Sequence, residues 1–206
     1  MKLKKLNRGA IFSFFVIVCV IVNIIVVSAQ RKEWKNEITD LTNEYFSVVR
    51  EALLLPEEYR SNGKMSDDEY SSYLDKITQK LKPLCVDNEV LLDSIVSSID
   101  KCLKAQMLSN IRLTDLKVEL LCNDFGEPTM YGASFVKDSA KTELLAKISS
   151  SLTKGAGYNS DYFFVASYQR INDEWKITGI EINWQDIIRN SSSGQTESLT
   201  YVVMGG

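Results

Sequence analysis

The sequence predicts an α+β protein, with helices in its first half and strands in its second, behind an apolar segment long enough to cross a membrane. The run from Ala10 to Ala29 contains no charged residue. Between residues 33 and 108 apolar residues recur every three or four positions, whereas from residue 111 onward they recur every second position. These periods are typical of helices and of half-buried strands. We therefore expect about three helices packed on a curved antiparallel sheet of four or more strands.

The apolar run has the length and composition of a transmembrane helix. Twenty residues at ~1.5 Å each span about 30 Å, the thickness of the hydrocarbon core. Basic residues gather in residues 1–9, which favours a cytoplasmic N-terminus and a C-terminus outside. Two interpretations remain open: an uncleaved single-pass anchor, or a signal peptide cleaved after Ala29 and a secreted product. In both, residues 30–206 lie outside, with all 27 acidic and 20 of the 24 basic residues, a net charge of −7.

Three helices are expected next, over residues 33–55, 66–82 and 87–108. Pro56 ends the first. Ser66 and Glu69 form a capping box that opens the second, and Pro83 ends it. Asp87 caps the third. The apolar stripe of the first helix is Trp34, Ile38, Leu41, Tyr45, Val48, Ala52 and Leu55.

Strands are expected over residues 111–122, 129–137, 161–171 and 174–184. The first two would pair as a hairpin around the turn at 124–128, and the last two around Asn172-Asp173, which tolerates positive φ. A change of apolar phase at Thr178-Gly179 predicts a β-bulge that keeps the apolar side chains on the core side, with glycine as the residue that permits it.

Residues 139–154 fit a helix better than a strand. Leu144, Leu145, Ile148 and Leu152 follow a helical period, so we expect a helix between the two pairs of strands. The domain plan is a basic cytoplasmic end (1–9), a transmembrane helix or signal peptide (10–29), an extracytoplasmic α+β domain (30–189), and a flexible linker with a strand-like tail (190–206).

The absence of histidine excludes Ser-His-Asp and Cys-His catalysis and zinc sites built on imidazole. We expect no catalytic, cofactor-binding or metal-binding residues and no cofactor. The acidic balance argues against nucleic-acid binding, which needs a basic surface. Acidic and phenolic groups on the strands that an enzyme could use are instead expected to face solvent: Asp115, Glu119, Tyr131, Tyr168 and Glu181.

Three cysteines lie in the exported part. Cys85 and Cys102 flank a predicted helix, the third, and are a candidate disulfide. The alternative is that Cys85, Cys102 and Cys122 are all buried, reduced thiols; an odd number leaves at least one unpaired. Both possibilities stay open.

The closing hairpin, Tyr168 to Glu181, has a polar turn followed by Trp175-Lys176-Ile177. It resembles the last hairpin of nuclear-transport-factor-2-like (cystatin-like) domains. That resemblance implies a cone-shaped pocket, with a candidate lining of Phe163, Phe164, Tyr168, Trp175 and Trp184. In overall plan the chain is similar to bitopic assembly proteins of bacterial secretion and conjugation systems, which act as scaffolds.

The expected function is a membrane-anchored extracytoplasmic interaction or scaffold protein, not an enzyme, in a bacterial cell-envelope, secretion or conjugation assembly. Its expected partners are the membrane, through residues 10–29, and other proteins. The alternatives are a binder of a small apolar or peptide ligand and a pocket enzyme of the same fold. A filled pocket favours the scaffold, an open apolar pocket the binder, and an open pocket with two convergent acids the enzyme.

Overall fold

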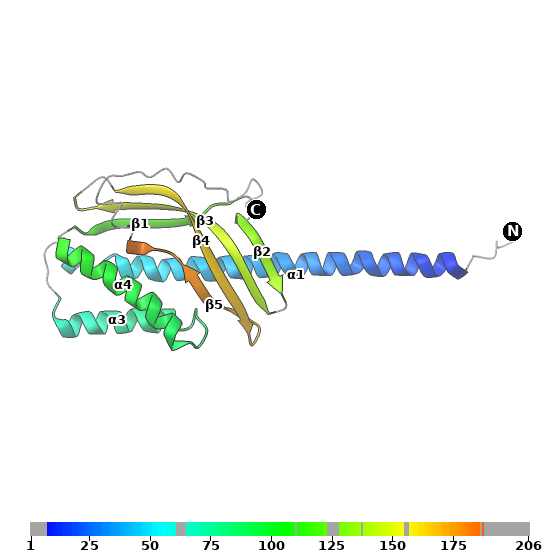
Figure 1. Ribbon diagram of the computed structural model, residues 1–206, viewed down its shortest axis with the longest axis horizontal. Coiled ribbons are helices and arrows are strands. Elements are labelled where there is room, and N and C mark those ends of the chain that lie inside the picture. The colour runs from blue at the N-terminus through cyan, green and yellow to red at the C-terminus, as the bar shows by residue number, and fades with distance from the viewer. Residues whose placement is uncertain are drawn as a thin grey trace, which may run out of the picture. The chain divides into compact units, whose positions relative to one another are not determined.

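The computed structural model describes residues 8–60, 65–109, 111–122, 128–136, 138–154, 157–185 and 187. Its elements are α1 (Arg8–Leu53), α2 (Glu57–Arg60), α3 (Asp67–Leu81), α4 (Glu89–Ser109), β1 (Leu113–Leu120), β2 (Met130–Val136), β3 (Ser139–Leu152), β4 (Tyr158–Ile171) and β5 (Glu174–Glu181). Helices come first and are followed by a curled antiparallel sheet (Figure 1). The predicted α+β class is confirmed.

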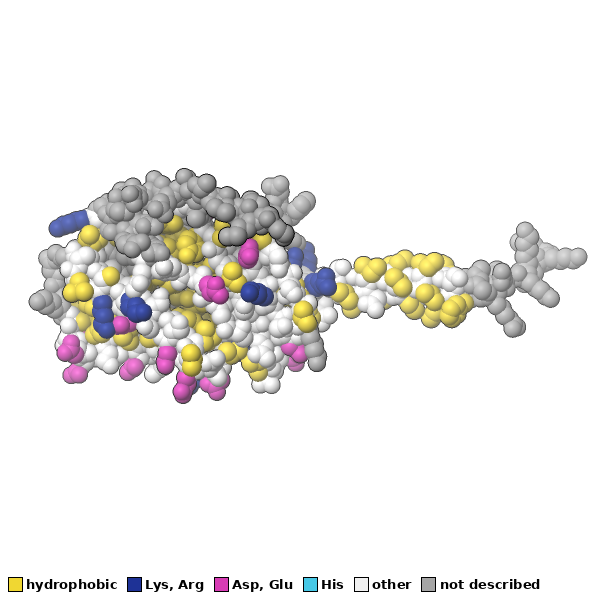
Figure 2. All heavy atoms as spheres, viewed as in Figure 1, with side chains coloured by type: hydrophobic (Ala, Val, Ile, Leu, Met, Phe, Trp, Pro, Cys, Tyr) yellow, Lys and Arg dark blue, Asp and Glu magenta, His cyan; other side chains and the backbone are white. Residues whose placement is uncertain are grey.

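Contacts divide the chain into two units, Met1–Thr39 and Asp40–Gly206. In the first unit the apolar side chains from Phe12 to Val27 are exposed (Figure 2). Among the described residues one helix, Phe12–Leu53, is apolar and long enough to cross a membrane, and its most apolar stretch has no buried residue. By length and composition this segment fits a membrane anchor or a signal sequence.

The core of the second unit begins inside α1. From Asp40 to the end of the helix the buried side chains are Thr42, Tyr45, Phe46, Val49, Ala52 and Leu53. They recur at three- and four-residue steps and so share one helix face. The predicted stripe was partly wrong, since Leu41 and Val48 are only half-buried and Phe46 and Val49 take the central places.

The predicted start of α3 is confirmed and that of α4 is one residue off. The Glu69 N–H donates to Ser66 Oγ over 3.3 Å and the Ser66 N–H donates to Glu69 Oε2 over 2.8 Å, which completes the capping box. At α4 the cap is Asn88, whose Oδ1 accepts from the N–H groups of Val90 (3.0 Å) and Leu91 (3.3 Å). Asn and Asp cap equally well, so the neighbouring Asp87 gave a misleading signal.

The expected hairpin between β1 and β2 is wrong. Both strands pair antiparallel with β3, along the same edge: β1 with residues 146–152 and β2 with residues 139–144. An isolated antiparallel bridge joins Cys122, which follows β1, to Pro128, which precedes β2. The hairpin partner of β2 is therefore β3, and the sheet order is β1-β3-β4-β5 with β2 continuing the β1 edge.

The expected helix at residues 139–154 is also wrong, because this segment forms the 14-residue strand β3. Every second residue is buried or nearly so: Ala140, Thr142, Leu144, Ala146, Ile148 and Ser150. Four of these six are small or polar, so the two-residue period is invisible in an apolar pattern. The four large residues that suggested a helix are divided between the two faces of the strand.

The predicted bulge in β5 is confirmed. Ser167 pairs with Gly179 and Tyr168 with Ile177, so Thr178 is the extra residue. Ile180, opposite Ala166, thereby returns to the face that carries Ile177. The hairpin turn is confirmed too, with φ of 51° at Asn172 and 65° at Asp173.

The role expected for glycine in the bulge is not borne out. Gly179 has no left-handed φ, and an added Cβ would meet the Ser167 Cβ at 3.9 Å, an ordinary contact. Glycine is needed instead at Gly157, where φ is 75° and an added Cβ would lie 2.4 Å from the Ser150 carbonyl oxygen.

We expect Gly179→Ala to change the free energy of unfolding by less than about 0.5 kcal/mol and Gly157→Ala to lower it by about 2 kcal/mol or more. The first substitution adds a methyl group where there is room. The second combines left-handed backbone strain with a clash against main chain. Urea unfolding of the two full-length variants in detergent measures both effects. Equal losses would contradict this assignment.

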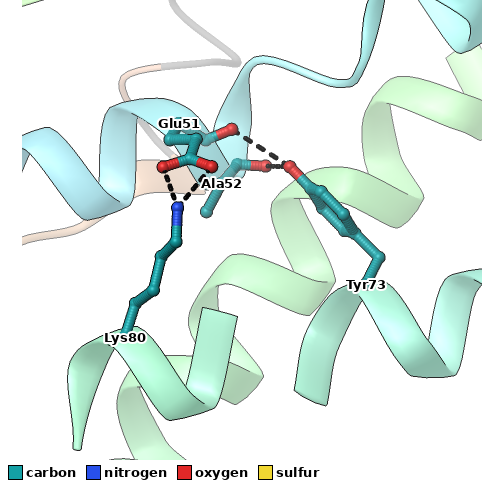
Figure 3. Close-up of polar contacts among 4 residues, drawn as sticks. All are labelled: Glu51, Ala52, Tyr73 and Lys80. Carbon is teal, nitrogen blue, oxygen red and sulfur yellow. Dashed lines mark hydrogen bonds and ion pairs between the residues drawn. The ribbon is translucent and has the colours of Figure 1, made fainter. Parts of the chain in front are cut away.

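Side chains of α3 and α4 cap the C-terminal end of α1. The Tyr73 hydroxyl donates to the carbonyl oxygens of Glu51 (3.0 Å) and Ala52 (2.9 Å), and Lys80 pairs with the Glu51 carboxylate (Figure 3). Gln106, which is buried, donates from Nε2 to the Leu53 carbonyl over 3.0 Å. These bonds satisfy carbonyls that the end of a helix leaves without partners.

Gln106 also accepts, at Oε1, the N–H of Leu113 over 2.9 Å, so one buried amide joins α1, α4 and β1. Gln106→Leu keeps the volume but leaves a buried carbonyl and a buried N–H unpaired. We expect it to lower the free energy of unfolding by about 2–3 kcal/mol. Gln79→Leu, at an exposed position of α3, is the matched control and should cost less than about 0.5 kcal/mol in the same urea titration.

Candidate functional site

The concave face of the sheet, where the resemblance implied a pocket, is filled by α1. Phe46 of α1 meets two aromatic rings edge-on: Phe164 at 5.4 Å between centroids and 75°, and Trp184 at 6.2 Å and 84°. Tyr45 lies beside Phe46, with ring centroids 5.7 Å apart. Phe164, Tyr168, Trp175 and Trp184 are each at most 5% exposed. This packing makes the face a core rather than an open ligand site.

A buried hydrogen bond fixes α1 on this face. Thr42 Oγ1 and the Tyr168 hydroxyl lie 2.7 Å apart, and neither residue is more than 1% exposed. Burial raises the pKa of Tyr168 well above its usual value, and the bond to Thr42 offsets this only in part. Burial raises the pKa of Tyr45 in the same way. Both phenols therefore stay neutral at physiological pH and act as structural groups.

Phe163 does not belong with the other four expected pocket residues. Consecutive residues of a strand point to opposite faces, and Phe163 precedes the buried Phe164. Its ring lies 5.6 Å from that of Tyr131 of β2. The structure thus brings Phe164, Tyr168, Trp175 and Trp184 to the core side and leaves Phe163, half-buried, on the other face.

The groups that an enzyme could have used do not converge. Glu119, Tyr131 and Glu181 are exposed, and Tyr168 is the buried partner of Thr42. Asp115 lies 3.9 Å from Arg50 and 4.0 Å from Lys117, in ion pairs open to solvent. Within the part of the chain that the structure describes, no three or more Cys, Asp or Glu residues are grouped to hold a metal ion.

The candidate disulfide is not formed: Cys85 and Cys102 are free, buried thiols. Cys85 lies after α3 in a parallel bridge with Ile177 of β5, whereas Cys102 faces the core from α4. Burial raises the pKa of Cys85 to about 11 and that of Cys102 to about 12. The alternative of three buried thiols is wrong for Cys122, which is exposed.

The described surface has a groove of about 330 Å³ between α1 and β1. Its lining comes from two elements: Asn43, Phe46, Ser47 and Arg50 of α1, and Lys117, Val118 and Glu119 of β1. Sequence reasoning missed it because its walls are about seventy residues apart in the chain. Phe46 joins this groove to the aromatic core, since it contacts Phe164 and Trp184 behind it.

A second depression, of about 470 Å³, lies between α2 and α3. Pro56, Tyr59, Met65 and Tyr73 supply its apolar and aromatic lining, and Glu58, Asp68, Glu69, Ser72 and Lys76 its polar lining. Hydrogen bonds from Ser66 lower the pKa of Glu69, so that carboxylate stays charged and serves the helix cap.

Taken together, these features offer surfaces for binding and a closed interior. The two grooves are open to solvent, and the aromatic cluster behind Phe46 is closed. No protein-family model matches this chain, and no curated protein matches it.

Proposed function

We propose that this chain is a membrane-anchored scaffold, whose α+β domain recruits protein partners on the outer side of the membrane in a bacterial cell-envelope, secretion or conjugation assembly. The observation that carries the proposal is the filled concave face. Phe46 occupies the space against Phe164 and Trp184 that a ligand or substrate would need. A domain with a closed interior works through its surface.

The membrane anchor is supported by the first unit. Its apolar side chains from Phe12 to Val27 are exposed, which is costly in water and favourable in lipid. The basic residues before the run favour a cytoplasmic N-terminus. We infer a single-pass protein with its α+β domain outside; secretion after cleavage is the alternative.

The resemblance to nuclear-transport-factor-2-like domains remains part of the proposal. The closing hairpin keeps its bulge and its turn. The helix expected at residues 139–154 would have departed from the simplest plan of that family, and a strand stands there instead. Helices followed by an antiparallel sheet support a resemblance of fold, and fold alone does not fix function.

The topology can be tested with the chain's own thiols. A membrane-impermeant maleimide applied to intact cells or spheroplasts should label Cys122, which is exposed, and spare Cys85 and Cys102, which are buried. Cys122→Ser should abolish the label. An intact mass that includes residues 1–29 would establish an uncleaved anchor. Labelling of Cys122 only after lysis, scored as the label that Cys122→Ser removes because Cys19 is a second exposed thiol, would place the domain inside the cell and overturn the topology.

The scaffold role can be tested by site-specific photo-cross-linking in native membranes. Val90 and Leu108 are 78% and 88% exposed on α4, and a cross-linker at either position reports a neighbouring protein. The control position is Ile99, which is buried on the same helix. We expect discrete protein adducts at one or both exposed positions and none at Ile99. A stoichiometric small molecule in native mass spectra, without adducts, would favour a ligand binder instead.

A further inference from the structure

We propose that the C-terminal segment Leu199–Met204 docks in the groove between α1 and β1 of the same chain, as an added strand on the free edge of β1. This inference goes beyond the scaffold role and does not depend on it.

The edge of β1 offers backbone groups for such a strand. The Leu121 N–H donates to the Leu145 carbonyl over 2.9 Å, and the register places Leu120 opposite Ala146. Hydrogen-bonded pairs alternate along an antiparallel ladder. The N–H and C=O groups of Leu116 and Val118 therefore point away from β3, and in the described residues no strand lies on that side.

The opposite edge of the sheet is already covered. The Val86 N–H donates to the Ile177 carbonyl over 3.0 Å, and the Ile177 N–H donates to the Leu84 carbonyl over 2.8 Å. The segment after α3 thus pairs with β5 as a short parallel strand. Since uncovered edges are sites of unwanted pairing, the edge that an additional strand would protect is the one formed by β1 and its continuation β2, and the groove lies beside β1.

The groove supplies room and apolar contact beside this edge. Its volume of about 330 Å³ lies between α1 and β1, with Phe46 and Val118 as its apolar walls. Arg50, Lys117 and Glu119 line the same groove with charges of both signs. An uncharged strand can form hydrogen bonds to the Val118 backbone and place every second side chain toward Phe46. Because it carries no charge, it is not repelled by the charged side chains of the groove.

Trp184, three residues before the last described residue, packs on Phe46, which lines the groove. Ile187, the last described residue, is buried. Eleven residues separate Ile187 from Leu199, and at ~3.3 Å each they reach about 36 Å. A tether of this length holds its end at an effective concentration on the order of millimolar. Docking within one chain is therefore favoured over exchange between chains.

The segment has the composition of a strand. Leu199-Thr200-Tyr201-Val202-Val203-Met204 contains three β-branched residues and one aromatic, without charge, glycine or proline. The stretch before it, residues 190–198, is rich in serine, a composition typical of linkers.

The test compares the full chain with a chain that ends at Arg189, both in detergent. A fluorescent peptide of residues 197–206 should bind the shortened chain and bind the full chain at least about tenfold more weakly, because the tethered segment competes. No binding to the shortened chain, or equal binding to both, would overturn the proposal. A dimer formed only by the full chain would show exchange between chains and overturn docking within one chain.

The matched variants act on one backbone group. In the shortened chain Val118→Pro removes an N–H that points away from β3, so the ladder survives, and peptide binding should be lost. Val118→Ala keeps the N–H and should bind. Hydrogen exchange covers the case in which the proline variant fails to fold: the Leu116 and Val118 amides should be protected in the full chain and exchange faster in the shortened one. Equal exchange rates would refute the added strand.

Discussion

Replacing Phe46 by alanine is expected to lower the free energy of unfolding by about 3–5 kcal/mol, because the ring is the centre of the aromatic cluster that closes the concave face. It contacts Phe164, Trp184 and Tyr45, and is 3% exposed. Its removal deletes buried apolar area and leaves a cavity that rigid neighbouring rings cannot collapse into. Urea unfolding of the full chain in detergent measures the loss.

Phe163→Ala is the matched control for this prediction. The same side chain is removed one residue from Phe164, but from the half-buried face, where its ring lies 5.6 Å from that of Tyr131. We expect a loss of about 1–2 kcal/mol there. Equal losses at the two positions would mean that Phe46 does not fill the interior as the structure describes.

The Phe46 variant also tests the argument for function. A cavity lined by aromatic rings stays dry and accepts small apolar molecules. Benzene or indole should therefore raise the urea midpoint of unfolding of the Phe46→Ala variant and leave that of the native chain unchanged. If benzene or indole stabilises the native chain to the same extent, an apolar site is already open in it. That result would favour the function of a ligand binder over that of a scaffold.

Local signals in the sequence were reliable where side chain and backbone interact within a few residues. The capping box at Ser66, the turn at Asn172-Asp173 and the bulge at Thr178 all follow from such short-range chemistry. The pairing of β1 with residues 146–152 does not. A chain reversal near residue 125 suggests a hairpin, whereas the actual pairing depends on a long strand, β3, that the apolar pattern conceals.

Of the aromatic cluster, the residues on the sheet could be predicted from the sequence, whereas the residue that α1 contributes could not. Alternation along β4 and β5 identifies Phe164, Tyr168 and Trp175 as one face. Phe46 shows no such signal, because Tyr45 and Phe46 are adjacent and either one could lead the stripe of an amphipathic helix. Tertiary packing decides it: both rings are buried, and it is Phe46 that meets Phe164 of β4 edge-on, a contact that local sequence does not encode.

Stability is expected to fall steeply above about pH 8.5, by about 4 kcal/mol between pH 8 and pH 10. Burial raises the pKa of Cys85 to about 11 and that of Cys102 to about 12 in the folded chain, whereas an unfolded thiol titrates near 8.5. The unfolded chain therefore loses these protons first. Stability from the two neutral thiols is complete below pH 8.5 and is lost as the pH rises toward 11 and 12.

Cysteine variants assign this slope to the buried thiols. Each buried thiol contributes about 1.4 kcal/mol per pH unit above its unfolded pKa. Between pH 8.5 and about pH 9.5, below the range in which the buried tyrosines contribute appreciably, Cys102→Ala should therefore halve the dependence, whatever the substitution costs at neutral pH. Cys122→Ala removes an exposed thiol and should leave the slope unchanged. Urea titrations under reducing conditions measure all three chains. A native chain with equal stability at pH 8 and 10 would show that the two thiols are not buried. Because Cys102 lies in α4 and Cys85 in the segment after α3, the packing of both elements would then need revision.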